Sequence, residues 1–335
     1  MPLTLRVRYP AKGRSILLRT DADWELDVAP VQEIDEGNTV VFRIERDDPF
    51  VEFKLCLREA DGTVHWSTGS NYVATAAVAA THDVYPVFHT AKGRISDAIE
   101  IPGAFGCETH RIRAYVPPGH DENPFKRFPV VYMHDGTNLF FPEESFLGAT
   151  WNVQGTLDAL DSMNVIDPVI VVAIEPVDRM KEFTSEGNEH YGRYIIECLK
   201  PVADDRGHTL PGPENTIVMG SSLAGLVSLH LAWSRPDVFG GAACLSSTFA
   251  FDDELFRRIG AESKKPIRIY LDSGSPKDNF EATLAMRNLL LRKGYRWGQD
   301  LIHFVHPGAK HHESAWAMRL HLPLQYFFGR GPSYG

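Results

Sequence analysis

The sequence predicts a chain of two parts: a small all-β, immunoglobulin-like sandwich over residues 1–88, and an α/β domain with a mostly parallel sheet over residues 89–335. Two observations predict this division. Short runs of alternating apolar residues fill the first part, whereas continuous apolar runs separated by helix-like stretches fill the second. Strands that alternate with helices along the chain typically form a parallel sheet with helices on its faces.

In the first part, short β-like runs are separated by turn signals. They are "SILLRT" (15–20), "TVVFRIE" (39–45), "VEFKLCLRE" (51–59) and "TVHWSTG" (63–69). The third run alternates, and one face of it is formed by Val51, Phe53, Leu55 and Leu57. This is the period of a strand with one buried side. "ADGT" at 60–63 predicts a hairpin turn before the next strand.

After about residue 90, apolar runs become continuous, as in strands buried on both faces. They are "RFPVVYMHDG" (127–136), "DPVIVVAIE" (167–175), "NTIVMGSS" (215–222) and "KPIRIYLDSG" (265–274). The helix-like stretches are "TWNVQGTLDALDSM" (150–163), "HYGRYIIECLKPVADD" (190–205), "LAGLVSLHLAWSRP" (223–236) and "NFEATLAMRNLLLRKG" (279–294). "HFVHPGAK" (303–310) predicts one more strand and a turn.

Composition narrows the expected partners and compartment. The formal net charge is −10; nucleic acid or an anionic membrane would require a basic face, so neither partner is expected. The N-terminus has no apolar segment of signal-peptide length, and no stretch approaches the roughly 18 apolar residues of a membrane span. We therefore expect a soluble cytoplasmic protein. Four widely spaced cysteines are expected to be separate thiols: Cys56, Cys107, Cys198 and Cys244.

The hexapeptide "GSSLAG" (220–225) lies where a buried strand meets an amphipathic helix. Many hydrolases hold a nucleophilic serine at such a turn, where the neighbouring positions must be small. Ser222 has Gly220 two residues before it and Ala224 two residues after it, so it fits better than Ser221 does. The alternative is an ordinary turn in which the serine caps the helix.

A serine nucleophile needs a base, and the base needs an orienting acid, in the chain order serine, acid, histidine for this kind of sheet. The strand "KPIRIYLDSG" and the loop after it offer the acids Asp272, Asp278 and Glu281. The stretch "FVHPGAKHHESAW" offers the bases His306, His311 and His312. Asp278 could instead cap the next helix, and His312 could be a surface residue.

These residues stand in stretches that resemble the putative esterase family of the α/β-hydrolase fold, which includes esterase D, feruloyl esterases and enterochelin esterase. The matching stretches cover most of residues 90–330: "PVVYMHDGTNLF" (129–140), "VIVVAIEPVDRMKEFT" (169–184), "IVMGSSLAGLVSLHLAWSRPDVFGGAACLSS" (217–247), "IYLDSG" (269–274) and "HHESAWAMRLHLPLQYFF" (311–328). The family pattern at the elbow is similar to GSSLGG. Ala224 departs from it, which concerns helix–strand packing rather than the nucleophile.

The resemblance implies a role for each candidate. Ser222 matches the family nucleophile. The family histidine lies five residues before a tryptophan, which is Trp316 here and selects His311. The family acid lies a few residues past the glycine that follows the strand, which favours Asp278, with Asp272 as the alternative.

An oxyanion hole needs two backbone N–H donors aimed at the developing negative charge. One is expected from Leu223, the residue after the nucleophile, and the other from the loop after "VVYMHDG", at Gly136 or Thr137. Arg179 and Glu182 match a family segment near the active-site mouth. We expect them to form an ion pair, to contact substrate or to serve a structural role.

Residues 1–88 resemble early-set or starch-binding sandwiches through "LLRTDADWE" (17–25) and "VHWSTGSNYV" (64–73). Trp24, Trp66 and Tyr72 could stack on sugar rings, although aromatic residues of a small sandwich more often belong to its core. The expected roles of this part are therefore binding of a glycan, shaping of the active-site mouth, or a homodimer interface.

The sequence thus predicts a serine carboxylic-ester hydrolase that works through an acyl-enzyme on a small-molecule ester, either an aryl or siderophore-type ester or one linked to carbohydrate. No cofactor or metal is expected, because the chain shows no HExxH or similar ligand spacing. Two alternatives stay open. One is acyl transfer on the same triad, and the other is a glycan-binding protein with a degenerate hydrolase domain.

Overall fold

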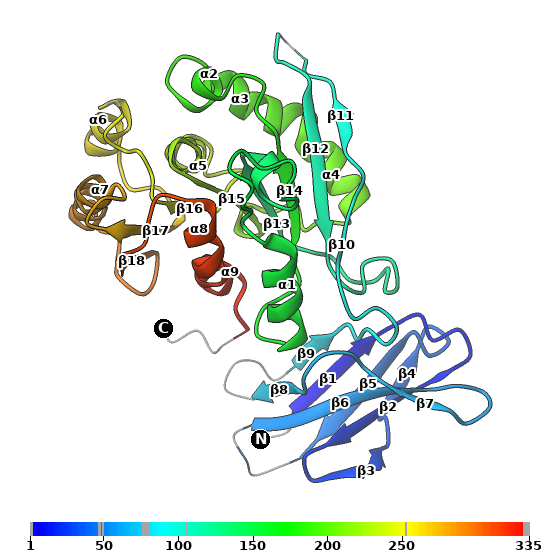
Figure 1. The fold of residues 1–335 in the computed structure, drawn as a ribbon. Helices are drawn as coiled ribbons and strands as arrows, with labels where there is room; N and C mark the ends of the chain where they lie inside the picture. The colour runs from blue at the N-terminus through cyan, green and yellow to red at the C-terminus, as the bar shows by residue number, and fades with distance from the viewer. Residues whose placement is uncertain are drawn as a thin grey trace.

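A computed structural model describes residues 3–45, 48, 50–75, 81–104, 106–251 and 253–330. Its strands form two small sheets near the N-terminus and one nine-stranded sheet (Figure 1). One small sheet has the order β4-β5-β1-β9, and the other has the order β3-β2-β6-β7, with β8 also paired to β6. The predicted mixed architecture, with a β-rich N-terminal part ahead of a mostly parallel sheet, is confirmed. The domain boundary at residue 88 stays a prediction.

The N-terminal strands pack their apolar faces against one another. Their bounds are β1 Leu3–Arg8, β2 Ser15–Thr20, β3 Asp23–Val28, β4 Gln32–Ile34, β5 Thr39–Ile44, β6 Phe50–Arg58, β7 Val64–Trp66, β8 Tyr72–Thr75 and β9 Thr81–Val84. The predicted face of β6, from Val51 to Leu57, lies in this core. The predicted turn at 60–63 joins β6 to β7, where Gly62 has a positive φ of 89°.

The middle of the opposite face of β6, at Lys54 and Cys56, is also buried, which the alternation did not predict. Lys54 points from it into the turn at 68–70, and its ammonium donates to the backbone carbonyls of Thr68, Gly69 and Ser70. These three acceptors allow a charged side chain to be buried in this strand.

The nine-stranded sheet has the order β10-β12-β14-β13-β15-β16-β17-β18, with β11 paired to β12. The bounds are β10 Arg94–Ile95, β11 Ile99–Ile101, β12 His110–Val116, β13 Val130–His134, β14 Ile170–Ile174, β15 Thr216–Ser221, β16 Gly241–Leu245, β17 Arg268–Ser275 and β18 Leu301–Pro307. The six strands in the order β14-β13-β15-β16-β17-β18 pair with their neighbours in the parallel sense. β12 pairs with β14 in the antiparallel sense.

Helices cover both faces of this sheet, because its central strands bury side chains on both sides. One face packs on α3 (Asn188–Tyr194), α5 (Leu223–Ser234), α6 (Glu254–Ala261) and α7 (Phe280–Arg292). The other packs on α1 (Val153–Ser162), α8 (Glu313–Arg319) and α9 (His321–Phe328). The short α2 (Arg179–Phe183) precedes α3, and a π-helical segment (Ile195–Leu199) joins α3 to α4 (Lys200–Gly207). The parallel strands therefore share a carboxyl edge, where the following loops meet.

Several elements were not predicted, among them β1, β4, β9 to β12, β16, α2, α6, α8 and α9. β16 has the sequence GAACL, and its small residues have little preference for strands outside this buried context. Its neighbours β15 and β17 pair with it on both sides and determine its conformation.

Hydrogen bonds join the N-terminal sheets to the rest of the chain. Glu122 accepts hydrogen bonds from the backbone N–H groups of Phe88, His89 and Thr90 and from the hydroxyl of Tyr9. The N–H of Ser70 bonds the last turn of α1, which ends beside the small sheets (Figure 1). No helix in the described ranges is long and apolar enough to cross a membrane.

The side chains at issue in the N-terminal part do not share one surface. Tyr72 stacks on Phe53 of the core, with ring centroids 5.3 Å apart. Trp66 is 43% exposed and lies against the guanidinium of Arg19. Trp24 lies on β3, with β2 and β6 between it and the strand of Trp66. Binding of a glycan here stays a prediction. The four cysteines are free thiols, as predicted.

Candidate active site

Ser222 lies at the sharp turn between β15 and α5, in the backbone conformation φ 57°, ψ −125°. Residues other than glycine rarely adopt this region, and such strain is maintained only where the surrounding structure enforces it. The N–H of Ser222 bonds the carbonyl of Leu245, and its carbonyl accepts from Thr248. Ser222 stands at the N-cap position, but its side chain makes no capping hydrogen bond. The alternative of a helix-capping serine is therefore wrong.

The departure at Ala224 is accommodated by the glycines around it. A Cβ added at Gly220 would lie 2.5 Å from the Cβ of Ala224, and one added at Gly225 would lie 1.9 Å from the hydroxyl of Ser247. Helix α5 thus approaches β15 and β16 closely through Gly220 and Gly225. A methyl group at position 224 fits into the buried core without opening the elbow.

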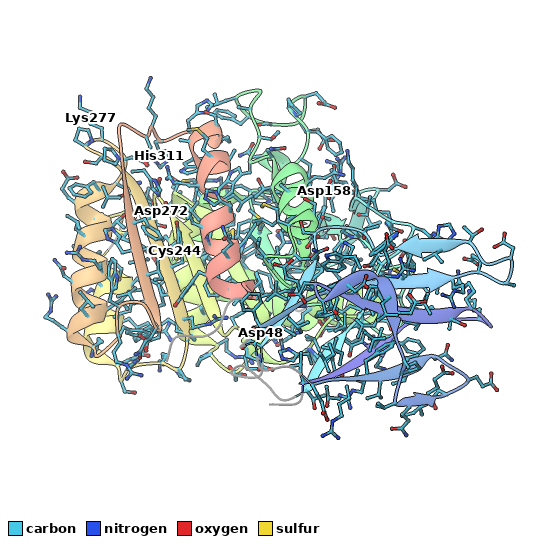
Figure 2. The ribbon with its side chains drawn as sticks, turned by 90° about the horizontal axis from the view of Figure 1, so that it is seen from below. Asp48, Asp158, Cys244, Asp272, Lys277 and His311 are labelled. Atoms are coloured by element: carbon cyan, nitrogen blue, oxygen red, sulfur yellow. The ribbon has the colours of Figure 1, made fainter. Side chains whose placement is uncertain are left out.

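His311 and Asp278 are held together at the carboxyl edge. Asp278 follows β17 and His311 follows β18, the neighbouring strand, and the His311 Nδ1–Asp278 Oδ1 distance is 2.7 Å. Figure 2 shows His311 at the same end of the sheet as Lys277, beyond Asp272 on β17. Trp316 packs edge-on against the His311 ring, with centroids 5.0 Å apart.

Ser246, just after β16, fixes the protonation of this pair. Its hydroxyl accepts from the indole N–H of Trp316 (2.9 Å) and from the guanidinium of Arg319 (2.5 Å), two groups that can only donate. Its own proton is therefore left for Asp278 Oδ2, 2.5 Å away. That oxygen also accepts from the N–H of Gly274 at 2.6 Å. Asp278 is surrounded by donors and is ionised.

The remaining oxygen of Asp278 faces His311, so the proton of the neutral imidazole lies on Nδ1 and Nε2 is free to act as a base. Burial alone would raise the pKa of Asp278, but hydrogen bonds from His311, Ser246 and Gly274 outweigh it and lower the pKa. Gly274 is needed here, because a Cβ at that position would lie 2.1 Å from the carbonyl of Ala309.

The other two candidate acids lie elsewhere. Asp272 is fully buried, and its Oδ2 accepts from the hydroxyl of Tyr270 and from Nε of Arg319. Burial raises its pKa to about 6, although the Arg319 charge opposes the shift. Glu281 lies in the first turn of α7. Asp278 does not cap that helix, since Asn279 holds the N-cap position.

The other candidate histidines also have different surroundings. His306 lies on β18 with its Nε2 3.9 Å from Asp272, and burial lowers its pKa. His312 is the N-cap of α8, where its ring accepts from the N–H of Ser314. Adjacent in sequence, His311 and His312 serve different partners.

The predicted backbone donors lie at the start of α5 and in a short turn after β13. Leu223 is the first residue of α5, and the N–H groups in the first turn of a helix have no intrahelical acceptor. Gly136 and Thr137 form a short 3₁₀ turn directly after β13, the strand next to β15. A Cβ at Gly136 would lie 2.9 Å from the backbone of Ile174, so only glycine allows this close turn.

An ion pair that sequence reasoning missed supports the Gly136 turn. Arg179, on α2, donates two hydrogen bonds to Asp135 at 2.7 and 2.8 Å. Asp135 has a left-handed φ of 56° immediately before Gly136. Of the three roles expected for Arg179 and Glu182, an ion pair between the two is wrong, because Glu182 bonds Nε2 of the buried His110. Nothing in the sequence or in the spacing of these residues indicated that Arg179 pairs with Asp135 or Glu182 with His110.

The fold is that of an esterase of the α/β-hydrolase type. The family model described as "Putative esterase" matches residues 103–323, more than half of the chain. The chain belongs to this family and is a carboxylic ester hydrolase. An "Uncharacterized protein YbbA" of Bacillus subtilis (strain 168) is 23% identical over 248 residues, which cover 67% of this chain and 94% of that protein.

Solved structures share the fold at low sequence identity. The enterobactin esterase of Shigella flexneri matches with a TM-score of 0.55 at 14% identity, and the match covers 97% of this chain and 93% of that chain. A ferulic acid esterase has a TM-score of 0.57 at 12% identity and covers 70% of this chain and 98% of its own. An IroE-like serine hydrolase from Shewanella oneidensis has a TM-score of 0.54 at 19% identity and covers 70% and 79%.

Proposed function

We propose that the protein hydrolyses carboxylic esters through an acyl-enzyme on Ser222, with His311 as base and Asp278 as orienting acid. The observation that carries the proposal is the 2.7 Å bond between His311 and an Asp278 held in its ionised, acceptor-only form. It leaves Nε2 of His311 as the basic atom. The strained elbow presents Ser222 at the same edge of the sheet.

In this reaction the Ser222 hydroxyl attacks the ester carbonyl carbon while His311 Nε2 takes its proton. The C–O bond to the alcohol then breaks, and the same proton passes to the departing alkoxide. Water repeats the sequence on the acyl-enzyme and releases the acid. Asp278 keeps its charge throughout and stabilises the imidazolium that forms twice.

The N–H of Leu223 and those of Gly136 and Thr137 would receive the oxyanion. The Arg179–Asp135 pair supports this role, because it fixes the backbone immediately before the second donor segment. Removal of one oxyanion donor typically costs about 2.7–4 kcal/mol of barrier.

Exposed apolar side chains on the loops at this edge favour an ester with a large apolar or aromatic group. The loop after β13 carries Phe146, which is 85% exposed, and Leu147; the loop after β14 carries Val177, α2 carries Met180, and the loop after β16 carries Phe251. β13 and β16 are the two neighbours of the nucleophile strand β15. A bound apolar group would remove these side chains from water, worth roughly 25 cal/mol per Å². We therefore favour aryl esters over carbohydrate-linked esters as the substrate class.

Turnover of a p-nitrophenyl ester panel tests this function. Wild type is expected to hydrolyse aryl-acid and medium-chain esters with higher kcat/KM than the acetate, and Ser222→Ala is expected to lose turnover. Ser221→Ala is the matched control, because it removes the neighbouring hydroxyl and should keep activity. Equal turnover by wild type and Ser222→Ala would overturn the proposal. Product analysis with an added acceptor alcohol separates hydrolysis from acyl transfer.

A further inference from the structure

Behind the catalytic pair lies a buried arginine–aspartate pair that the reaction itself does not use. Arg319, the last residue of α8, is 3% exposed, and Asp272 on β17 is fully buried. Nε of Arg319 donates to Asp272 Oδ2 at 3.0 Å, while its Nη2 reaches Ser246 at 2.5 Å and Asp278 Oδ2 at 3.4 Å. One guanidinium thus connects both aspartates and the serine between them.

The donors from Arg319 and Trp316 orient the proton of the Ser246 hydroxyl towards Asp278. Without the Arg319 and Trp316 donors, the Ser246 hydroxyl could turn its proton elsewhere, and Asp278 Oδ2 would lose its shortest side-chain hydrogen bond. Ser246 itself has a left-handed φ of 46°, and its N–H bonds the carbonyl of Asp272. A strained residue whose backbone and hydroxyl both bond this cluster is held there by its partners.

Asp272 is the counter-charge that makes the buried guanidinium tolerable. A buried charge without a partner costs several kcal/mol, so an unpaired Arg319 would seek the nearest other carboxylate. That carboxylate is Asp278, already 3.4 Å from Nη2. Asp272 therefore keeps Arg319 from competing with His311 for the catalytic acid.

We propose that Arg319 and Asp272 are positioning residues of the esterase site: Arg319 directs the Ser246 hydroxyl onto Asp278, and Asp272 holds Arg319 in that place. The inference rests on the proposed function. Asp272, which the sequence offered as the alternative triad acid, then supports Asp278 and does not itself orient His311.

The charged and titratable groups around His311 come from three elements. β17 and the loop after it contribute Asp272 and Asp278, and α8 contributes Arg319 and Glu313. β18 contributes His306, whose ring faces Asp272. Lys310 adjoins His311 in the chain. Neutralising one of the paired charges would change the field at His311 and leave the other groups in place.

The test is the acid limb of kcat/KM against pH for Asp272→Asn, which keeps side-chain volume, and for Arg319→Gln, which replaces the guanidinium with a smaller neutral amide. Asp272 is ionised above about pH 6. In that range, removing its negative charge makes imidazolium less stable, so Asp272→Asn should move the limb to lower pH; Arg319→Gln should move it to higher pH. At several ångströms, each shift is expected on the order of one pH unit. The double variant should return near the wild-type position.

Both single variants should also lower kcat, by about 10- to 100-fold as for other residues that orient a reacting group, with little change in KM. Ser246→Ala should lower kcat but move the acid limb less than the two charge variants do, because it removes no charge. It also remains informative if a buried-charge variant fails to fold. Arg268→Gln is the matched control: it replaces an arginine near the other end of β17, bonded to the carbonyls of Tyr326 and Phe327, and should leave the limb unmoved.

Two failures can be told apart. If turnover depends on Ser222 but the limb stays at the wild-type pH in both single variants, or if Ser246→Ala keeps full kcat, the positioning role is overturned and the esterase function stands. If wild type shows no Ser222-dependent turnover, the esterase function fails and the positioning role falls with it.

Discussion

The buried Lys54 of the N-terminal sheets and the buried polar side chains at the carboxyl edge of the large sheet have different partners. In the N-terminal part, Lys54 gives its donors to backbone carbonyls of its own region. At the carboxyl edge, Ser246, Asp278 and Arg319 bond one another across three elements, and the network ends at a half-exposed histidine. Backbone satisfaction stabilises a fold, whereas side chains that satisfy one another around a titratable group mark a functional site.

The comparison predicts its largest effect at Asp278. Asp278→Asn should lower kcat by about 10⁴-fold. The donors from Ser246 and Gly274 require an oxygen at the Oδ2 position, so the new amide N–H₂ must face His311 and force the proton to Nε2. Steady-state kinetics against p-nitrophenyl esters measure the loss. Asp237→Asn, on an exposed turn, is the control and should keep full activity.

A second prediction concerns the N-terminal sheets. Lys54→Met should lower the free energy of unfolding by about 1–3 kcal/mol, because the turn at 68–70 loses its buried donor. The kcat/KM of the folded variant should stay within about twofold of wild type. Urea denaturation and ester turnover on one preparation test both statements, with Lys92→Met on the surface as control. A large loss of kcat with unchanged stability would show that the two regions do not differ as described.

A third prediction uses pH. Burial, with a smaller effect of the Arg179 charge, lowers the pKa of His134 to about 3, so the folded protein keeps this ring neutral. The unfolded chain takes up a proton below about pH 6.5, and the free energy of unfolding therefore falls as pH drops from 7 towards 3. At pH 5 the buried neutral His134 lowers the free energy of unfolding by about 2 kcal/mol relative to pH 7 and above. His134→Gln should show a shallower decline in urea melts between pH 7 and 5; an unchanged slope would contradict it.

Sequence reasoning found the catalytic candidates because their signals are local. Ser222 stands between a buried strand and a helix, and the order of Asp278 and His311 follows from the topology. Ser246 and Arg319 escaped it. "CLSS" is an ordinary run of small residues, and Arg319 would pass for a surface position on α8 although it is buried. Their role depends on contacts between residues more than 70 positions apart, which no spacing encodes.

Some elements of the fold were also beyond local pattern. The small residues of β16 take strand form because β15 and β17 bond them on both sides. Trp316 served in the sequence only to locate His311, yet its indole N–H holds the Ser246 hydroxyl. Packing on the ring and bonding of its nitrogen emerge only when α8 folds over the sheet.

The most direct test of the central claim is the intact mass of the protein after incubation with a fluorophosphonate probe. Wild type and Ser221→Ala should each gain one stoichiometric adduct, located by peptide mapping at Ser222, and Ser222→Ala should gain none. An adduct on Ser222→Ala, or no adduct on wild type at any probe concentration, would contradict the assignment of Ser222 as the activated nucleophile.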